Sequence, residues 1–261
     1  MATGLSGAAR NVSDVRISVI TAVFNNHGTV AAALDSVLSQ SHPRVEVIVI
    51  DGMSNDGTRD VLEDYSKHID VYVSEPDGGI YDALNKGIAL ATGDVVGFLH
   101  ADDLMADERV LARVADAFAD PAVEAVYGDL VYVRRDDETQ IVRTWTAGTF
   151  DVRQLSWGWM PPHPTFYVRR EVYKRMGAFD VTYRIAADYD CMLRFLTGGV
   201  RVAYVPHLLV RMRVGGVSNR SIGNLVVKSR EDFRALNKHG LAGVLGLLGK
   251  NLRKLPQFFV R

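Results

Sequence analysis

The spacing of apolar residues in the first half of the chain alternates between the periods of strands and of helices. Runs rich in β-branched residues predict buried strands at Arg16–Val23, Val45–Ile50, Ile69–Val73 and Val95–Leu99. The segments between them carry apolar residues three and four positions apart, as amphipathic helices do. This alternation predicts an α/β fold built from right-handed βαβ units, with a mostly parallel central sheet flanked by helices.

The helices predicted for this half follow the same pattern. The first is expected to be capped by Asn25 and Asn26. Its apolar face consists of Val30, Ala33, Leu34, Val37 and Leu38. Further helices are predicted at Thr58–Ser66, Ile80–Leu90 and Asp107–Phe118.

After about Val123 the regular alternation stops. Two longer segments, Val123–Val133 and Thr139–Thr146, predict an antiparallel pair of strands around a polar turn. A Trp- and Pro-rich loop, Trp157–Pro164, comes next. The remaining predictions are a strand at Thr165–Val168, a helix at Asp188–Leu196 and strands at Val200–Val205 and Leu208–Val214.

The chain is therefore expected to divide into a flexible amino-terminal tail over 1–15, one α/β domain over 16–218 and a carboxy-terminal helical tail over 219–261. In the last part, Ile222–Lys238 predicts a polar helix. The segment Gly240–Lys254 carries leucines on one face and basic residues at its end, a pattern that can lie in a membrane interface. The alternative is a segment packed on the domain, or on a second copy of the chain in a homodimer.

Composition narrows the class of protein. The net charge of −1 gives no reason to expect a nucleic-acid partner, and the single Cys191 excludes an internal disulfide and a cysteine-based zinc site. Met1–Asp14 lacks the apolar core of a signal peptide, and no apolar run reaches the ~18–20 residues that span a bilayer. A cytoplasmic location is expected, with peripheral contact at the inner face of the membrane through the basic tail.

Acidic residues follow the fourth predicted strand directly. Asp102 and Asp103 come after Val95–Leu99, where open α/β sheets bind their ligands. Two adjacent carboxylates repel each other unless a cation or a group of donors lies between them, and a divalent metal that carries a diphosphate meets that need. The alternative is that Asp103 merely caps the next helix.

Other strand ends carry residues suited to a nucleotide. A carboxylate such as Asp51 can accept an N–H of uracil, thymine or guanine, although an Asp before Gly52 also forms turns. The sequence Asp77-Gly78-Gly79 allows close approach of backbone. Farther along, Lys86 is placed to reach a phosphate, or is simply a surface lysine.

The second half adds a carboxylate and a histidine. Asp188 lies at or just before the start of a predicted helix, which suits an ionised carboxylate and a general base; a plain helix cap is the alternative. His163 lies between two prolines in the loop that contains Trp157 and Trp159, whose rings can stack on a sugar or fill a core.

Several nucleotide-binding classes lack support. No G-x-G-x-x-G follows the first strand, so a dinucleotide-binding dehydrogenase is disfavoured, and no P-loop motif occurs. The arginine-containing glycine-rich loop of a sugar-nucleotide nucleotidyltransferase is missing from Thr21–Gly28. A non-catalytic nucleotide- or glycan-binding module stays open as an alternative.

Taken in order, these motifs resemble the inverting family 2 glycosyltransferases with their GT-A nucleotide-diphospho-sugar transferase fold. The resemblance covers about Ile17 to Ser218, and the sequence His100-Ala101-Asp102-Asp103 is most similar to the branch that assembles colanic acid and glycolipids. It is carried by residues 18–25, 49–58, 77–87, 93–94, 99–103, 163–164 and 187–190. His100 departs from the pattern, since many relatives have an acid there.

The resemblance implies a role for each matching residue. Asp188 would be the catalytic base, and Asp102 and Asp103 would hold Mn²⁺ or Mg²⁺, with Asp102 also contacting the ribose. The donor, a sugar carried on UDP, dTDP or GDP, would be bound by Thr21, Phe24, Asn25, Asp51, Asp77, Lys86, Asp102, His163, Arg211, Arg213 and Ser218. The two arginines and Ser218 would close over the diphosphate. The acceptor would be a hydroxyl of a glycan or lipid-linked molecule.

Overall fold

The computed structural model of the chain describes residues 14–215, 222–241, 243, 246 and 249. The first half alternates strands and helices as predicted: β1 (Ile17–Val23), α1 (Val30–Leu38), β2 (Val45–Asp51), α2 (Thr58–Asp64), β3 (Val71–Ser74), α3 (Ile80–Leu90) and β4 (Val95–Phe98). The second half contains β5 (Asp103–Met105), α4 (Val110–Ala117), β6 (Ala125–Val133), β7 (Ile141–Trp145), the 3₁₀ turns η2 (Val152–Trp157) and η3 (His163–Thr165), β8 (Tyr167–Arg169), α5 (Arg170–Met176), α6 (Ala187–Thr197), β9 (Val202–Arg213) and α7 (Ile222–Lys238).

The strands of the described residues form one sheet in the order β3-β2-β1-β4-β8-β6-β9-β5, with β7 paired to β6. The first four strands are parallel, as predicted. The second half is mixed, because β8 is antiparallel to both β4 and β6 whereas β9 is parallel to β6. The predicted hairpin around Arg134–Glu138 is present as the antiparallel pair β6–β7.

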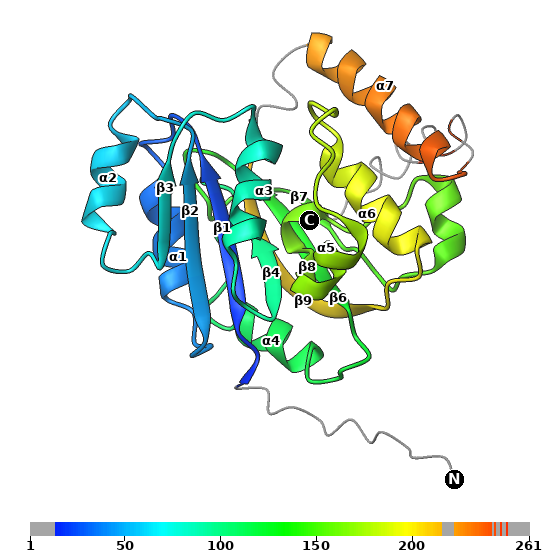
Figure 1. The fold of residues 1–261 in the computed structure, drawn as a ribbon, viewed down its shortest axis with the longest axis horizontal. Coiled ribbons are helices and arrows are strands. Elements are labelled where there is room, and N and C mark those ends of the chain that lie inside the picture. Colours follow the sequence, from blue (N-terminus) through cyan, green and yellow to red (C-terminus); the bar gives the residue numbers. More distant parts are fainter. Residues whose placement is uncertain (1–13, 216–221, 242, 244–245, 247–248, 250–261) are drawn as a thin grey trace.

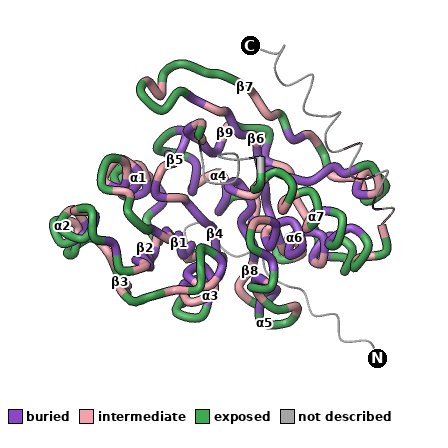
Figure 2. Tube along the Cα trace, turned by 90° about the horizontal axis from the view of Figure 1, so that it is seen from above, coloured by how far each residue is buried: buried purple, intermediate pink, exposed green. Residues whose placement is uncertain are grey.

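Helices cover both faces of this sheet (Figure 1). One apolar cluster joins α3, α5, α6 and α7 to one face of the sheet, and a second joins α1, α2 and α4 to the other. Alternate residues of the central strands supply the two clusters: Ile48 and Ile50 point to the first, and Val47 and Val49 to the second. Each central strand is consequently buried along its length (Figure 2), as covered parallel strands are.

Three local predictions are wrong. The helix α1 begins at Val30 with Thr29 as its N-cap, so neither asparagine caps it, and Asn25 has a left-handed backbone (φ 48°). The two strands predicted over 200–214 are one strand, β9, whose register against β6 shifts near Asp129. The helix α4 begins at Val110, so Asp103 is not its cap; Asp103 instead begins β5.

The helix predicted over Ile222–Lys238 is present as α7. It lies beside α6 (Figure 1), and Ala235 and Leu236 are fully buried in the cluster that contains α6. No helix among the described residues is long and apolar enough to cross a membrane. The basic residues predicted to contact a membrane, Lys250, Arg253 and Lys254, lie outside the described residues, as does the amino-terminal segment 1–13.

Candidate active site

The carboxyl ends of the parallel strands meet at one edge of the sheet. Val23 at the end of β1 pairs with Asp51 at the end of β2, and Asp51 pairs with Ser74 at the end of β3. The end of β4 lies on the other side of β1, where Phe98 pairs with Ile20. The candidate residues from four separate parts of the sequence therefore gather at the edge where open α/β sheets bind ligands.

An exposed aromatic ring and a carboxylate lie against a glycine at this edge. The ring of Phe24 is 62% exposed. A Cβ added to Gly52 would come within 2.5 Å of Asp77 Oδ2 and 3.4 Å of Phe24 Cδ2, so only glycine fits there without a shift of the carboxylate. A flat apolar surface beside hydrogen-bond acceptors suits the face and edge of a nucleobase. Thr21 lies deeper in β1 and is buried.

Asn25 ties two loops of this edge together. Its backbone N–H donates to Ser54 Oγ (2.9 Å), and its side-chain Oδ1 accepts from the backbone N–H of Asn55 (2.9 Å). The left-handed backbone of Asn25 aims both groups at the loop after β2. Asn25 thus shapes the wall of the site instead of capping α1.

Asp51 is enclosed by two serines. Its carboxylate accepts from the backbone N–H of Ser54 (3.1 Å) and from the hydroxyl of Ser74 (2.6 Å), and its side chain is fully buried. The bond to Ser54 is the turn that an Asp before glycine was expected to form. The role of Asp51 in reading a base stays a prediction.

Lys86 is held by acids of its own neighbourhood. Its Nζ lies 2.9 Å from Glu75 Oε1 and 3.4 Å from Asp82 Oδ2, and it donates to the carbonyl oxygen of Pro76 (3.0 Å). These contacts join α3 to the loop that carries Asp77, whose Oδ1 accepts from the N–H of Gly79 (2.8 Å). In this structure Lys86 therefore supports the loop, and its contact with a phosphate stays a prediction.

The two adjacent acids after β4 differ in environment. Asp102 is partly exposed, whereas Asp103 is 1% exposed and accepts from the backbone N–H of Arg213 (3.2 Å). Among the described residues, Oδ2 of Asp103 is buried and has no hydrogen-bond partner. Burial, followed by the charge of Asp102, raises the pKa of Asp103 well above its ordinary value.

Arg213 fixes the segment that holds these acids. Its guanidinium is 6% exposed, donates to the main-chain oxygen of Asp102 (2.9 Å) and forms an ion pair with Glu138 (2.6 Å). Arg213 thus joins β9, the β6–β7 turn and the acidic pair. Arg211, two residues earlier, is partly exposed, and no described residue pairs with its guanidinium. Ser218 lies outside the described residues.

Asp188 lies in the first turn of α6 and faces α3. Its Oδ1 is 3.1 Å from the hydroxyl of Tyr81, and its Oδ2 is 3.9 Å from Nδ1 of His163. Its side chain keeps 28% of its surface exposed. Asp188 therefore combines access with a fixed direction.

Two histidines link Asp188 to the acids after β4. Burial lowers the pKa of His100 below its ordinary value, and the nearby charges of Asp102 and Asp188 offset this only in part. The ring of His163 stacks on Phe98 (5.6 Å between centroids) and lies 6.1 Å from the ring of His100. Burial lowers the pKa of His163 to about 4, so this imidazole is neutral at pH 7.

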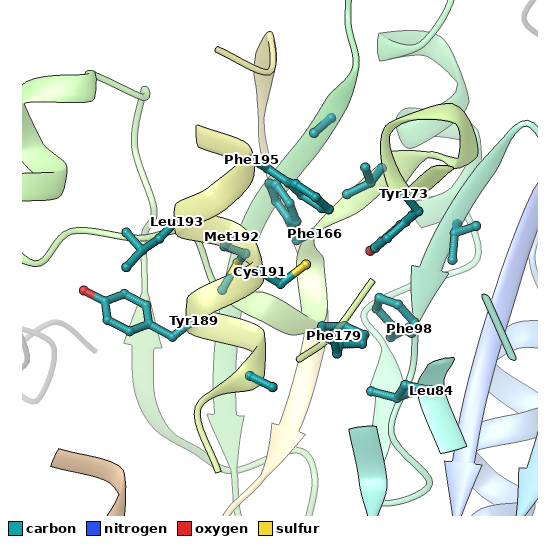
Figure 3. Packing of buried hydrophobic residues seen from close by; sticks show 14 of the residues in the cluster. Leu84, Phe98, Phe166, Tyr173, Phe179, Tyr189, Cys191, Met192, Leu193 and Phe195 are labelled. Atoms are coloured by element: carbon teal, nitrogen blue, oxygen red, sulfur yellow. The ribbon is translucent and has the colours of Figure 1, made fainter. Parts of the chain in front are cut away.

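The core behind α6 fixes the position of Asp188. Cys191 and Phe195 point from α6 toward Phe98 and Tyr173, and Tyr189 and Leu193 point to the opposite side of the helix (Figure 3). All four of these α6 side chains are buried. Because the helix is anchored on both sides, its amino-terminal turn presents Asp188 to the edge of the sheet.

The sequence reasoning missed Tyr81. Its hydroxyl lies 2.6 Å from the carbonyl oxygen of Ile185 as well as 3.1 Å from Asp188. Burial and then the charge of Asp188 raise the pKa of Tyr81 well above its ordinary value, so the phenol keeps its proton. Its position in the first turn of α3, two residues after Gly79, is the one signal that points to it, since Asp188 is 107 residues away.

A family model and the relatives in sequence all point to glycosyltransferases. The family model described as "Glycosyl transferase family 2" matches residues 18–184. An uncharacterized glycosyltransferase of Mycobacterium tuberculosis (strain ATCC 25618 / H37Rv) is 33% identical over 181 residues, which cover 68% of each chain. A PGL/p-HBAD biosynthesis glycosyltransferase of Mycobacterium bovis (strain BCG / Pasteur 1173P2) is 29% identical over 217 residues, covering 81% of this chain and 82% of that protein.

Solved structures with the same fold are more distant in sequence. The mannosyltransferase PcManGT of Pyrobaculum calidifontis, in complex with GDP-Man and Mn²⁺, superposes with a TM-score of 0.67 at 21% identity, over 94% of this chain and 73% of that chain. TarS of S. aureus (residues 1–349) gives a TM-score of 0.66 at 19% identity, over 92% of this chain and 71% of that one. Both carry the GT-A fold that the resemblance implied.

Proposed function

The chain belongs to glycosyl transferase family 2 and is a glycosyltransferase, and from that premise we propose the reaction that its site performs. It transfers a sugar from a nucleoside-diphosphate sugar, with UDP, dTDP or GDP as the nucleotide, to a hydroxyl of a glycan or glycolipid. Transfer occurs in one displacement, with inversion at the anomeric carbon. The observation that carries the proposal is Asp188, a partly exposed carboxylate fixed between Tyr81 and His163.

The donor lies along the carboxyl edge of the parallel strands. Its base stacks on Phe24 beside Gly52, within reach of Asp77, and Asp51 supports this wall through Ser54 and Ser74. Its diphosphate extends toward Asp102 and the partly exposed Arg211. PcManGT and TarS are described with GDP-Man and UDP-GlcNAc respectively, which supports a nucleoside-diphosphate sugar without choosing the nucleotide.

A divalent cation fits the acidic pair. Mg²⁺ and similar cations are commonly held by one or two carboxylates together with phosphates of the substrate, and Asp102 with the unpaired Oδ2 of Asp103 offers that donor set. No group of three or more His, Cys, Asp or Glu side chains in the described part of the chain is arranged to hold a metal, and we propose that the diphosphate supplies the remaining ligands. A bound Mn²⁺ or Mg²⁺ would offset the charge of the leaving diphosphate.

The chemistry at the acceptor falls to Asp188. A hydroxyl attacks the anomeric carbon poorly unless a base takes its proton, a contribution typically worth ~10²–10⁴-fold. Tyr81 keeps its proton, and the side chain of His163 is 9% exposed against 28% for Asp188, so we assign the acceptance of that proton to Asp188. As the carbon–oxygen bond to the acceptor forms, the bond to the diphosphate breaks, and the leaving group departs on the opposite face.

The first experiment identifies the nucleotide. Thermal unfolding is measured with UDP, dTDP, GDP and CDP, each with and without Mn²⁺. A ligand at ~100 times its Kd adds about 2.7 kcal/mol of stability, so binding gives a readable rise in Tm. We expect a metal-dependent rise with one of UDP, dTDP and GDP. If none of the nucleotides raises the Tm, the proposed donor class is wrong.

The second experiment tests the base. Asp188→Asn keeps the size of the side chain and removes its basicity, so the rate of transfer should fall by ~10²–10⁴-fold while the nucleotide still binds. Asp116→Asn, an exposed residue of α4 on the other face of the sheet, is the matched control. Wild-type transfer by Asp188→Asn would exclude Asp188 as the base.

A further inference from the structure

The carboxy-terminal helix α7 holds the segment that leads into α6. Glu231 of α7 accepts hydrogen bonds from three successive backbone N–H groups: Oε1 from Arg184 (2.8 Å), and Oε2 from Ile185 (2.8 Å) and Ala186 (2.9 Å). Consecutive N–H groups that converge in this way form a site for an anion. Here the anion is a side chain of the same chain, supplied from 45 to 47 residues away.

This segment is also held from the opposite direction. The carbonyl oxygen of Ile185 accepts from the hydroxyl of Tyr81 on α3 (2.6 Å). The peptide groups of 184–186 therefore lie between a donor on α3 and an acceptor on α7. The N-cap residue of α6, Ala186, has no polar side chain of its own to cap the helix. Asp188 follows two residues later, so its placement depends on how these peptide groups are held.

Further contacts set α7 in this orientation. Arg234 donates to Thr182 Oγ1 (3.1 Å), and Lys238 pairs with Asp180 (3.2 Å). Glu231, Arg234 and Lys238 are three and four residues apart, so they share one face of the helix. That face is turned toward the loop over 180–186, and the buried Ala235 and Leu236 fasten the helix to the core.

A buried carboxylate in α6 adds a second anchor. Asp190 is fully buried, and Lys238 Nζ (3.1 Å) and His239 Nε2 (3.0 Å) lie at its Oδ1. Burial opposes its ionisation, but hydrogen bonds from His239 and Lys238 hold the pKa of Asp190 below its ordinary value. The backbone before Asp188 and the side chain of Asp190 after it are thus both attached to α7 and its end.

We propose that Glu231 is a positioning residue for the transfer reaction, acting through Asp188. The inference rests on the proposed function, which makes Asp188 the base. Glutamine at 231 keeps the shape but replaces one acceptor oxygen by an NH₂ group, which faces a backbone N–H and cannot accept from it. The segment 184–186 then relaxes, and a displacement of about 1 Å at a catalytic group costs about 10²-fold in rate.

The test compares Glu231→Gln with Glu171→Gln, an exposed glutamate paired with Lys174 on α5 (2.7 Å). Acceptor-dependent release of the nucleoside diphosphate is measured with the donor that the thermal panel selects. We expect Glu231→Gln to lower kcat by about 10- to 100-fold, with unchanged donor KM and unchanged nucleotide-dependent rise in Tm. Glu171→Gln should match the wild type.

Amide hydrogen exchange supplies a readout that needs no activity. In the wild-type chain, the amides of 184–186 should be as protected as those of α6, and Glu231→Gln should speed their exchange. Rapid exchange of these amides in the wild type would overturn the proposal even if the variant did not fold.

Each remaining outcome separates the two proposals. If Asp188→Asn is inactive and Glu231→Gln has wild-type kcat, the positioning role is wrong and the proposed function stands. If Asp188→Asn keeps wild-type transfer, the proposed function itself fails. If Glu231→Gln loses nucleotide binding together with kcat, Glu231 supports the whole domain and not Asp188 in particular.

Discussion

At the scale of single residues, burial keeps two neighbours of Asp188 uncharged. His163 and Tyr81 both contact Asp188, and burial disfavours the charged form of each. Asp188 lies in the first turn of α6, and 28% of its side chain is exposed. Of these three side chains, Asp188 is therefore the one placed to meet a substrate.

His163 should make folding stability depend on pH. Its pKa is about 4 in the folded chain against an ordinary value of 6.5, so between these values the unfolded chain binds a proton that the folded chain does not. The contribution of His163 to the free energy of unfolding is fully present above about pH 6.5, and it is lost as the pH falls toward 4. At 1.36 kcal/mol per pH unit, the loss at pH 4.5 amounts to about 2–3 kcal/mol.

Urea unfolding at pH 7.5 and pH 4.5 checks this prediction. His163→Gln should lose about 2–3 kcal/mol less than the wild type between the two pH values. His68→Gln, at an exposed histidine of the α2–β3 loop, should leave the difference unchanged. An equal loss in wild type and His163→Gln would show that His163 is not the titrating group.

Sequence reasoning located Asp188, Asp102 and Asp103 because each follows a local signal, the end of a strand or the start of a helix. It did not separate the two acids after β4, since their difference comes from β9: the N–H of Arg213 reaches Asp103 from 110 residues away. The local sequence could not predict the contacts of Lys86 either. A lysine placed to reach a phosphate and a lysine paired with Glu75 have the same local sequence.

At the scale of elements, the four parallel strands and their helices were predictable because their apolar periods are local. The strand β5 was missed because Asp103–Met105 is too short to show a period, and its partner β9 is more than a hundred residues away. The single strand β9 was divided in two because Pro206 and His207 resemble a turn, yet its pairing with β6 continues past them with a shift in register.

Close packing between β4 and β8 should tolerate no added atom. A Cβ on Gly97 would lie 2.2 Å from Cε1 of the fully buried Tyr167. Overpacking of this kind typically costs about 1–3 kcal/mol, so Gly97→Ala should lower the free energy of unfolding in urea by that amount. Gly28→Ala, where a Cβ meets nothing within 4 Å, is the control. Equal stability of the two variants would contradict the close packing.

At the scale of the whole molecule, the described glycines after α7 pack closely against the rest of the chain. A Cβ on Gly243 would meet the ring of Phe233 of α7 at 2.7 Å, and one on Gly249 would meet the main-chain oxygen of Trp157 at 2.3 Å. Glycines spaced three residues apart therefore lie against α7 and η2. Glycine disfavours a helix, but its lack of a side chain allows this close approach.

We expect contact with a membrane to come from the basic residues of the segment beyond α7. Its basic residues Lys250, Arg253 and Lys254 would be attracted to anionic lipid, at about 1 kcal/mol each near the surface. We expect the full chain to float with vesicles that contain anionic lipid, and a chain ending at Lys238 to float less. A chain with these three residues changed to Gln is the control for charge. Equal flotation of all three would contradict the membrane contact.

The bonds from Glu231 to residues 184–186 also bear on when the protein becomes able to work. Synthesis on the ribosome proceeds from the amino end, and a domain generally folds as a unit. Glu231 is translated after every described strand of the sheet. The segment 184–186 therefore cannot gain its contacts with Glu231 until α7 has left the ribosome, so the placement proposed for Asp188 is among the last features that a newly made chain acquires.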